Sequence, residues 1–454
     1  MIGAKTALPD ISFSTGELRY SPGMKTEPGI RPSEALKHVR YEIRGRLARR
    51  ALELERQGYE IISLNIGNPR AFGLRTPETM RLAMIENLAQ AEGYCHQKGI
   101  FPAREAVVMQ QQERGIGGVT AEEVFIGNGV SELIDLTLRA LLSDGDEVLV
   151  PSPDYPLWTA AVTLNRGRAV HYPCRPAQGF VPDPEEIARL ITPRTRAIVI
   201  INPNNPTGAV YPRAVLEALA RLAEQHGLVV FSDEIYDQMT YEGAEFVPMA
   251  TLVHDTLCAT LSGLSKVYRA CGYRAGWAVF SGRVHAAAEY LDALELLASL
   301  RLCSNVMAQW AVQTALGGHQ SIRELIAPGG RLYESRAVIL EAVRRSRYLT
   351  LAPPAGAMYA FVGVDEASVP DFDDQQFALD LLEQKHVLVA PGVSFNVPYR
   401  NHFRITNLPD AATLREVFSR IEELLGAYAS GERRAGGAGA DNVVSAESRF
   451  KSTL

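Results

Sequence analysis

Between about residues 122 and 280 the chain alternates short apolar runs with segments of helical period, and this alternation restricts the possible folds more than any other feature. Segments of helical period, such as Ser131–Leu142, Leu157–Leu164 and Arg213–His226, separate most of the apolar runs. Apolar strands that alternate with helices are typical of a mainly parallel sheet covered on both faces. We therefore predict an α/β unit whose strands are Val124–Ile126, Glu147–Val150, Ala169–Tyr172, Ala197–Ile201, Leu228–Phe231 and Thr256–Leu261.

The pattern differs on either side of this block. Before it, a helical pattern over residues 33–58 is followed by a short apolar strand over residues 61–66, which stops at Gly67-Asn68-Pro69. After about residue 330, helical stretches are mixed with short apolar runs, and the mixture predicts a second, smaller α+β unit. Its predicted elements are Tyr359–Val362, Gln375–Lys385, Val387–Val389, Phe403–Thr406 and Ala411–Tyr428.

Charge and cysteine content exclude several classes of protein. The formal net charge is -6, so no basic field attracts the chain to nucleic acid or to an anionic membrane. The five cysteines are widely separated and form no C-x-x-C pair, which favours reduced thiols over disulfides or a zinc site. No apolar run approaches the roughly 18 residues of a membrane helix, and the first residues lack the apolar region of a signal peptide. We therefore expect a cytoplasmic protein without a metal ion.

Polar residues gather where the predicted strands end. In an open parallel sheet, ligands bind beyond the carboxyl ends of the strands. The strand Val124–Ile126 is followed by Gly127-Asn128-Gly129-Val130-Ser131-Glu132 and a helix. Small residues and a helix N-terminus suit a phosphate, although a plain turn capped by Ser131 gives the same pattern. The segment has neither the lysine of a Walker A loop nor the third glycine of a dinucleotide fingerprint.

Two further strands end in an amide and an acid. Asn205 lies in the turn Asn202–Gly208, where it could bond a phenolate oxygen or a carboxylate, or could serve only as a turn residue. Asp233 ends the strand that begins at Leu228. A buried acid at this place can pair with a cation such as a protonated pyridine nitrogen, whereas the alternative is the cap of a following helix.

The strand Thr256–Leu261 leads to Ser265-Lys266, and Arg274 follows eight residues after the lysine. The amine of Lys266 could form an imine with an aldehyde cofactor if its surroundings lower its pKa. An arginine nearby could hold a phosphate with two hydrogen bonds. A lone Ser-Lys pair is usually a surface feature, so the prediction depends on the four strand ends together.

These motifs occur in the order found in a known family. The chain resembles the fold type I, class I/II aminotransferases through Asn205-Pro206-Thr207-Gly208, Asp233-x-x-Tyr236, Ser265-Lys266 and Arg274 in Gly272-Tyr273-Arg274-Ala275-Gly276. Longer stretches are similar to the bacterial alanine aminotransferase branch, namely LNIGNP, GYCHQKG, IGNGVSELI, PSPDYPLW, INPNNPTGAVY and DEIYD. The resemblance extends from about residue 33 to about residue 428. It implies a mainly parallel seven-stranded sheet sandwiched by helices, with a smaller α+β domain.

The resemblance implies pyridoxal 5'-phosphate as the cofactor and gives roles to the residues that face its ring. Lys266 matches the lysine that holds the cofactor as a Schiff base and carries protons. Asp233 matches the acid on the pyridine nitrogen, while Tyr236 and Asn205 match the two groups on the 3-oxygen of the cofactor. Tyr155 matches the aromatic side chain that stacks on the ring.

The resemblance also implies a phosphate cup, a substrate site and a homodimer. Val130, Ser131, Ser265 and Arg274 match the phosphate cup. Tyr94 matches the tyrosine that reaches the phosphate of the neighbouring subunit's cofactor, which implies a homodimer. Gly67 and Arg404 match residues at the substrate, where Arg404 would bind the α-carboxylate. Arg44 is a candidate for a second substrate contact, with an ordinary helix-surface arginine as the alternative.

We therefore predict an aminotransferase that works by a ping-pong mechanism on alanine and a 2-oxo acid, 2-oxoglutarate or pyruvate. One alternative keeps the fold and cofactor but uses another amino donor in a specialised biosynthetic pathway, or acts as a lyase. A non-catalytic cofactor-binding regulator is disfavoured, because the arm that would carry a DNA-binding module is short and not basic. The predicted division is an arm at 1–32, the first part of the small domain at 33–66, a large cofactor-binding domain at 67–325, a small C-terminal domain at 326–429 and a disordered tail at 430–454.

Overall fold

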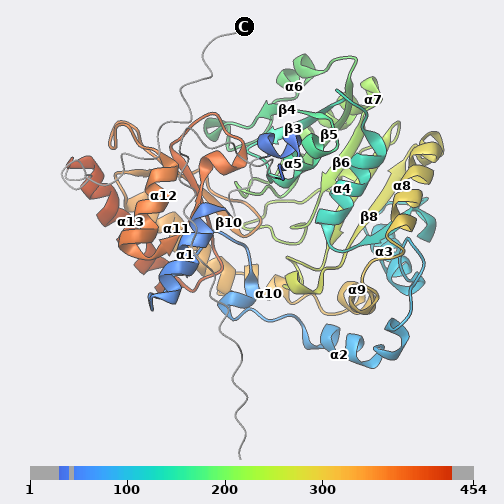
Figure 1. Ribbon diagram of the computed structural model, residues 1–454, viewed down its shortest axis with the longest axis horizontal. Helices are drawn as coiled ribbons and strands as arrows, with labels where there is room; N and C mark the ends of the chain where they lie inside the picture. Colours follow the sequence, from blue (N-terminus) through green and yellow to red (C-terminus); the bar gives the residue numbers. More distant parts are fainter. Residues whose placement is uncertain (1–29, 40–44, 432–454) are drawn as a thin grey trace, which may run out of the picture.

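The structure is a computed structural model that describes residues 30–39 and 45–431. These residues form two lobes of unequal size (Figure 1). The larger lobe contains a seven-stranded sheet, and the smaller lobe contains a four-stranded sheet and a two-stranded pair. No helix in the described ranges is long and apolar enough to cross a membrane.

The large sheet confirms the predicted α/β architecture. Its strands lie in the order β2-β8-β7-β6-β5-β3-β4, and only β8 runs antiparallel to its neighbours. The strands are β2 (Val124–Gly127), β3 (Glu147–Ser152), β4 (Arg168–Pro173), β5 (Thr195–Ile201), β6 (Val229–Asp233), β7 (Leu257–Gly263) and β8 (Gly276–Gly282). The apolar runs predicted six of these strands, and β8 is the one that they did not identify.

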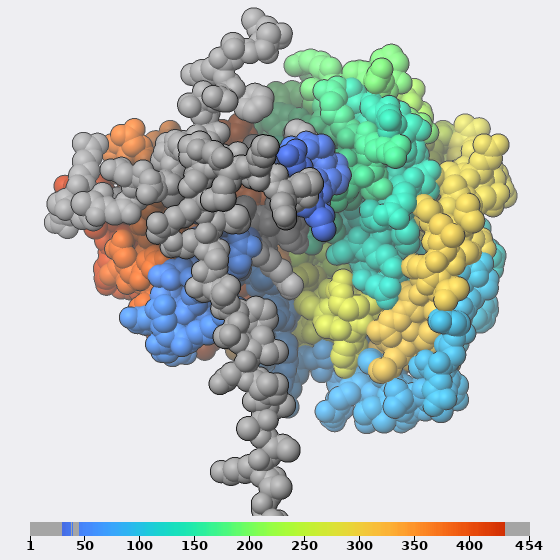
Figure 2. Space-filling model, in the orientation of Figure 1, coloured from blue at the N-terminus to red at the C-terminus, as the bar shows by residue number. Residues whose placement is uncertain are grey.

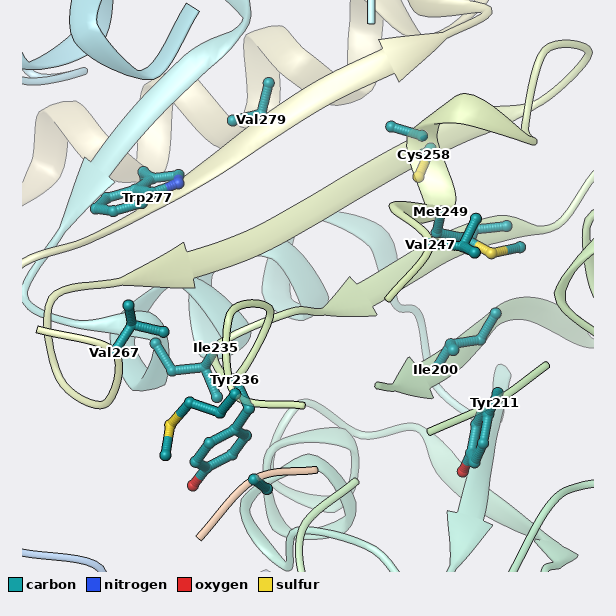
Figure 3. Close-up of a cluster of buried hydrophobic side chains, with 14 of the residues drawn as sticks. Ile200, Tyr211, Ile235, Tyr236, Val247, Met249, Cys258, Val267, Trp277 and Val279 are labelled. Atoms are coloured by element: carbon teal, nitrogen blue, oxygen red, sulfur yellow. The ribbon is translucent and has the colours of Figure 1, made fainter. Parts of the chain in front are cut away.

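Both faces of the large sheet are buried, which explains why its strands are continuously apolar. Along β5, Ile200 faces one hydrophobic cluster and its neighbour Val199 faces the other. Figure 3 shows part of the first cluster, in which Cys258 of β7 points toward Met249 and Val247. One face is covered by α7 (Arg213–His226). The other face is covered by α4 (Val130–Leu141), α5 (Leu157–Leu164) and α8 (Ala288–Leu300).

The remaining helices of the large lobe pack at its periphery. Contacts join α9 to both α2 and α3, below the sheet in the view of Figure 1. Two short helices, α6 and α10, complete this group. The bounds are α2 (Glu78–Glu86), α3 (Phe101–Glu113), α6 (Pro184–Leu190), α9 (Val306–Gly317) and α10 (Ile322–Ile326).

The small lobe confirms the predicted α+β unit. Its antiparallel sheet has the order β12-β13-β10-β9, and β1 pairs with β11 in parallel. The strands are β1 (Ile62–Ser63), β9 (Leu349–Thr350), β10 (Tyr359–Val364), β11 (Val387–Leu388), β12 (Ala390–Pro391) and β13 (His402–Thr406). The helices are α1 (Arg46–Arg56), α11 (Arg331–Arg345), α12 (Asp374–Lys385) and α13 (Ala411–Ala429).

The first two helices of the described chain contact different lobes. The short helix η1 (Glu34–His38) lies against α5 of the large lobe, where Figure 2 shows it in dark blue over the green surface. The next described helix, α1, packs instead on α12 of the small lobe. The predicted substrate contact Arg44 precedes α1 and lies outside the described residues.

Candidate active site

A cavity of about 1010 Å³ lies at the carboxyl ends of the central strands and is lined by both lobes. All but two of the predicted site residues line it, namely Gly67, Val130, Ser131, Tyr155, Asn205, Asp233, Tyr236, Ser265, Lys266, Arg274 and Arg404. One exception, Tyr94, is 82% exposed and does not reach this cavity. The other exception is Arg44, whose surroundings are not described.

The loop that follows β7 carries Lys266 into the cavity. Its Nζ donates a hydrogen bond of 2.8 Å to the backbone oxygen of Gly67. Gly67 follows β1 at the edge of the small lobe, so this bond joins the two lobes across the cavity. The lysine is therefore presented to a bound ligand from the large lobe while Gly67 forms the opposite wall.

Asp233 ends β6 and is buried in the cavity wall. Its Oδ2 accepts a hydrogen bond of 3.1 Å from Nε1 of Trp158, and Oδ1 accepts one of 3.4 Å from the amide of Ile235. Burial raises the pKa of Asp233 to about 6, while these hydrogen bonds and the charge of Lys266 act in the opposite direction. A cation brought next to this carboxylate would stabilise the ionised form.

The N-terminus of α4 and Arg274 form a cradle suited to an anion. Gly129 precedes α4 with a φ of 82°, and a Cβ at this position would collide with the guanidinium of Arg274. Arg274 donates to the backbone oxygens of Asn128 at 3.1 Å and Cys271 at 2.9 Å. Free amides at a helix N-terminus and an arginine beside them are the usual partners of a phosphate. Ser131 lines the same cavity.

Arg404 on β13 is enclosed almost completely by protein. One of its terminal nitrogens donates to Oδ1 of Asn205 at 2.8 Å, and the other donates to the backbone oxygen of Asn65. Its guanidinium lies between two aromatic rings, 4.2 Å from the centroid of Tyr359 and 4.7 Å from that of Phe395. The buried Nε has no hydrogen-bond partner within the protein. Such a cation is held ready for an anionic group of a ligand.

Tyr359 also lines the cavity, although it is not among the site residues predicted from the sequence. Its hydroxyl accepts a hydrogen bond of 3.3 Å from the hydroxyl of Tyr236, and the two rings meet edge to face at 5.9 Å. Burial on its own raises the pKa of Tyr359, but the charges of Lys266 and Arg404 and the bond from Tyr236 outweigh it and lower the pKa below its ordinary value. Burial raises the pKa of Tyr236 well above its ordinary value.

Neither Tyr359 nor Trp158 gave a distinct signal in the sequence. Both lie within apolar runs at positions typical of core residues, Trp158 inside α5 and Tyr359 at the start of a strand of the small lobe. Their polar atoms nevertheless point to Tyr236 and Asp233. Partners for these two predicted residues could therefore be identified only from the three-dimensional arrangement.

The cavity fits pyridoxal phosphate in each of its parts. The cradle at α4 suits the phosphate, the buried Asp233 suits a protonated ring nitrogen, and Lys266 suits an aldehyde carbon. Trp158 holds Asp233 in place by its indole N–H. The fold and the cavity together define a pyridoxal-phosphate-dependent enzyme of fold type I.

Comparison with known proteins narrows this class to one family. The family described as "Aminotransferase class I and II" matches residues 59–421. Glutamate-pyruvate aminotransferase AlaA of Escherichia coli (strain K12) is 48% identical over 399 residues, which cover 88% of this chain and 98% of that protein. Alanine aminotransferase of Mycobacterium tuberculosis (strain H37Rv) is 45% identical over 397 residues, or 87% of this chain and 92% of the relative. The chain therefore belongs to the class I and II aminotransferases.

The solved structures agree with this assignment. The crystal structure of an aminotransferase from Escherichia coli superposes with a TM-score of 0.87 at 48% identity. The superposition covers 88% of this chain and 99% of that one. The predicted fold and the cofactor that it implies are thereby confirmed.

Proposed function

We propose that this aminotransferase exchanges an amino group between alanine and 2-oxoglutarate, giving pyruvate and glutamate. The observation that carries the proposal is that Lys266 and the buried Arg404 line the same cavity. The names of the relatives that are 45% and 48% identical support alanine and glutamate as the amino acids. Among the described residues, the basic side chains that line the cavity are Lys266, Arg274 and Arg404. The uncharged side chain of alanine needs no further partner, whereas the side-chain carboxylate of glutamate needs one more cation, for which Arg44 stays the predicted candidate.

We assign the ends of the cofactor and the substrate to separate groups of residues. Val130, Ser131, Ser265 and Arg274 hold the phosphate by backbone amides, hydroxyls and a guanidinium. Tyr155 covers one face of the ring. Arg404 binds the α-carboxylate of the substrate, and Gly67 offers its backbone on the same side.

The polar edge of the ring is assigned to three side chains that surround it. The carboxylate of Asp233 keeps the ring nitrogen protonated, because its negative charge stabilises the protonated nitrogen. The positive nitrogen in turn favours the ionised form of the buried acid. Tyr236 and Asn205 donate to the 3-oxygen, for which the amide of Asn205 is free while its Oδ1 accepts from Arg404. Asn205 therefore connects the substrate site to the cofactor site.

Pyridoxal phosphate, when bound, supplies a conjugated ring that accepts the electrons released at the substrate Cα. The amine of Lys266 would take the proton from the substrate Cα and would then deliver a proton to the cofactor carbon that carries the amino group, so one amine serves as both base and acid. Arg404 fixes the substrate carboxylate so that the Cα–H bond faces Nζ. The reaction has two halves. An amino acid leaves as its 2-oxo acid, and a second 2-oxo acid then takes up the amino group.

We further propose that the enzyme is a homodimer. The support is the exposed Tyr94, the residue expected to reach the phosphate of a second subunit. Gln97 bonds Glu295 of α8 at 2.6 Å and so places this segment beside exposed Leu296 and Leu300. Apolar side chains exposed together are typical of a protein interface. Light scattering should give the mass of two chains.

The proposed cellular location follows from the cysteines. All five cysteines are free thiols, and they include the buried Cys174 and Cys258. A reducing compartment maintains thiols in this state, which supports the cytoplasm.

The experiment that tests the function is a screen of half-reactions on purified enzyme with cofactor. Each amino acid is added singly, and the visible absorbance of the lysine-bound cofactor is followed. Alanine and glutamate should convert this absorbance to that of the amine form. Lys266→Ala should abolish both the absorbance and the turnover, while the surface variant Lys385→Ala should retain both. Discharge by another amino acid alone would replace alanine as the substrate, and full activity in Lys266→Ala would contradict the mechanism.

A further inference from the structure

Tyr359 reaches the cavity from the small lobe, whereas Tyr236 reaches it from the large lobe. Tyr359 begins β10, and Tyr236 follows β6. Both side chains are buried, and the two hydroxyls are each other's hydrogen-bond partners at 3.3 Å. Their contact is therefore a polar link between the lobes at the place assigned to the 3-oxygen of the cofactor.

Packing alone does not explain the hydroxyl of Tyr359. The ring of Tyr359 covers the guanidinium of Arg404 at 4.2 Å, and a phenylalanine would cover it equally well. Without the Tyr359 oxygen, however, the buried hydroxyl of Tyr236 would lose its partner. An unpaired buried hydroxyl costs free energy. The oxygen atom thus has a polar role that is separate from the aromatic ring.

The backbone at Gly67 leaves room for this oxygen. A Cβ at Gly67 would collide with the Tyr359 hydroxyl and would contact the sulfur of Met358 at 3.0 Å. The backbone oxygen of the same glycine accepts the hydrogen bond from Lys266. The Tyr359 hydroxyl and the amine of Lys266 therefore both lie next to Gly67.

Charged groups surround this pair of hydroxyls on several elements. Lys266 after β7 and Arg404 on β13 favour negative charge on the Tyr359 oxygen, and Cys271 opposes it. Asp233 at the end of β6 acts against ionisation of Tyr236. Tyr359 is thus the more acidic hydroxyl of the two. It is therefore the better hydrogen-bond donor when Tyr236 acts as an acceptor.

We propose that Tyr359 is a positioning residue, whose hydroxyl donates to Tyr236 and thereby directs the proton of Tyr236 to the 3-oxygen of the cofactor. In the structure Tyr236 donates to Tyr359. A hydroxyl has one proton and can also accept, so a new acceptor for Tyr236 reverses the direction of the bond between the two tyrosines. Hydrogen bonds in a chain polarise one another, so the donation by Tyr236 becomes stronger. The inference depends on the proposed function, since it assumes the assignment of Tyr236.

The test is a pH titration of the visible absorbance of the enzyme with bound cofactor. Donors to the 3-oxygen stabilise its negative form and hold down the pKa of the lysine–cofactor link. Tyr359→Phe keeps the ring on Arg404 but removes the hydroxyl. The midpoint should therefore rise by about half a pH unit or more, the size expected for one hydrogen bond. The matched control is Tyr241→Phe, which removes a buried hydroxyl bonded to Ala357 outside the cavity and should leave the midpoint unchanged.

A double variant tests whether the effect passes through Tyr236. In a Tyr236→Phe background, Tyr359→Phe should cause no additional shift, because the group that it directs is missing. A wild-type midpoint in Tyr359→Phe, or an equal shift in both backgrounds, would overturn this inference while leaving the aminotransferase assignment intact. If the wild-type enzyme with cofactor shows no lysine-bound absorbance, the proposed function fails together with the inference.

Discussion

The side-chain amide of Asn396 in the small lobe donates a hydrogen bond of 2.9 Å to the carboxylate of Asp154 in the large lobe. Two other bonds accompany it, since the amide of Asp154 donates to the Phe395 oxygen at 3.1 Å and Ser152 donates to the Asn396 oxygen at 2.8 Å. We call this group of bonds the Asp154 clasp. It holds the turn after β3 against the segment after β12.

The Asp154 clasp connects two walls of the cavity. Tyr155, which lines the cavity, follows Asp154 directly. Phe395 lies under the guanidinium of Arg404 at 4.7 Å. The Asp154 clasp therefore fixes the position of Tyr155 relative to Arg404.

The free energy of unfolding should depend on pH through the ionisation of Asp154. Burial raises the pKa of Asp154 to about 7, although Thr159 and Asn396 donate to its oxygens. The folded pKa lies above the unfolded value of about 3.9, so the contribution to stability is complete below about pH 4 and is lost as pH rises through about 7. Asp154→Asn cannot ionise. Its melting temperature relative to wild type should therefore rise between pH 4 and pH 8 in thermal unfolding.

Asp410→Asn is the matched control for this titration. Asp410 caps α13, and the amide of Thr413 first among its hydrogen bonds lowers the pKa of Asp410. A lowered pKa gives a contribution that is present above about pH 4 and lost in more acidic solution. The difference between Asp410→Asn and wild type should thus stay constant from pH 5 to pH 8. A constant difference for Asp154→Asn over the same range would show that Asp154 does not titrate there.

The sequence predicted those parts of the fold in which burial gives a strand or helix a simple apolar pattern. Alternating apolar and helical runs located β2 to β7 because these strands are buried on both faces. The antiparallel β8 was not identified, since glycines at both of its ends resemble a loop. The strand predicted over residues 61–66 is limited to Ile62–Ser63, because its partner β11 is equally short and Asn65 then turns toward Arg404.

The candidate site was predictable only in part, for a related reason. Residues such as Lys266 and Asp233 follow the ends of strands, and the topology of a parallel sheet brings such positions together. Tyr359 belongs to another sheet, and its approach depends on how the lobes pack and on the missing side chain at Gly67. Periodicity carries no information about that packing. The predicted contact of Tyr94 involves a second chain and stays a prediction.

Arg404→Lys should weaken substrate binding more than it affects the fold. A lysine keeps the charge but cannot replace two directed donors and a planar group stacked between Tyr359 and Phe395. The expected result is a fall in kcat/KM of about 30- to 100-fold for alanine and for glutamate, chiefly through KM. Steady-state kinetics measure it. Arg336→Lys, whose arginine stacks on Tyr241 away from the cavity, is the control and should keep a wild-type KM.

Trp158→Phe should raise the pKa of Asp233 and weaken its hold on the ring nitrogen. The indole N–H donates to Asp233 at 3.1 Å and is the main hydrogen bond that opposes the effect of burial. Losing one bond to a charged group corresponds to about 1.5 to 3 kcal/mol, so cofactor affinity should fall by about 10- to 100-fold at neutral pH. Equilibrium titration of the cofactor-free protein with pyridoxal phosphate measures it. An unchanged affinity would show that Trp158 serves only to fill the core.

Gly67→Ala should disturb the cavity although alanine is the smallest possible addition. The new Cβ would collide with the Tyr359 hydroxyl, and Tyr359 is held by Arg404 and Tyr236 and cannot simply rotate away. The backbone or Tyr359 must therefore shift, and we expect kcat/KM to fall by at least about 10-fold, as for other small displacements of substrate-positioning groups. Gly117→Ala, where the Cβ meets nothing within 4 Å, should retain wild-type kinetics. Because Tyr359→Phe removes the atom nearest to the new Cβ, the double variant Gly67→Ala/Tyr359→Phe should recover part of the loss. A Gly67→Ala enzyme with wild-type kinetics would show that the wall formed by Tyr359 yields freely.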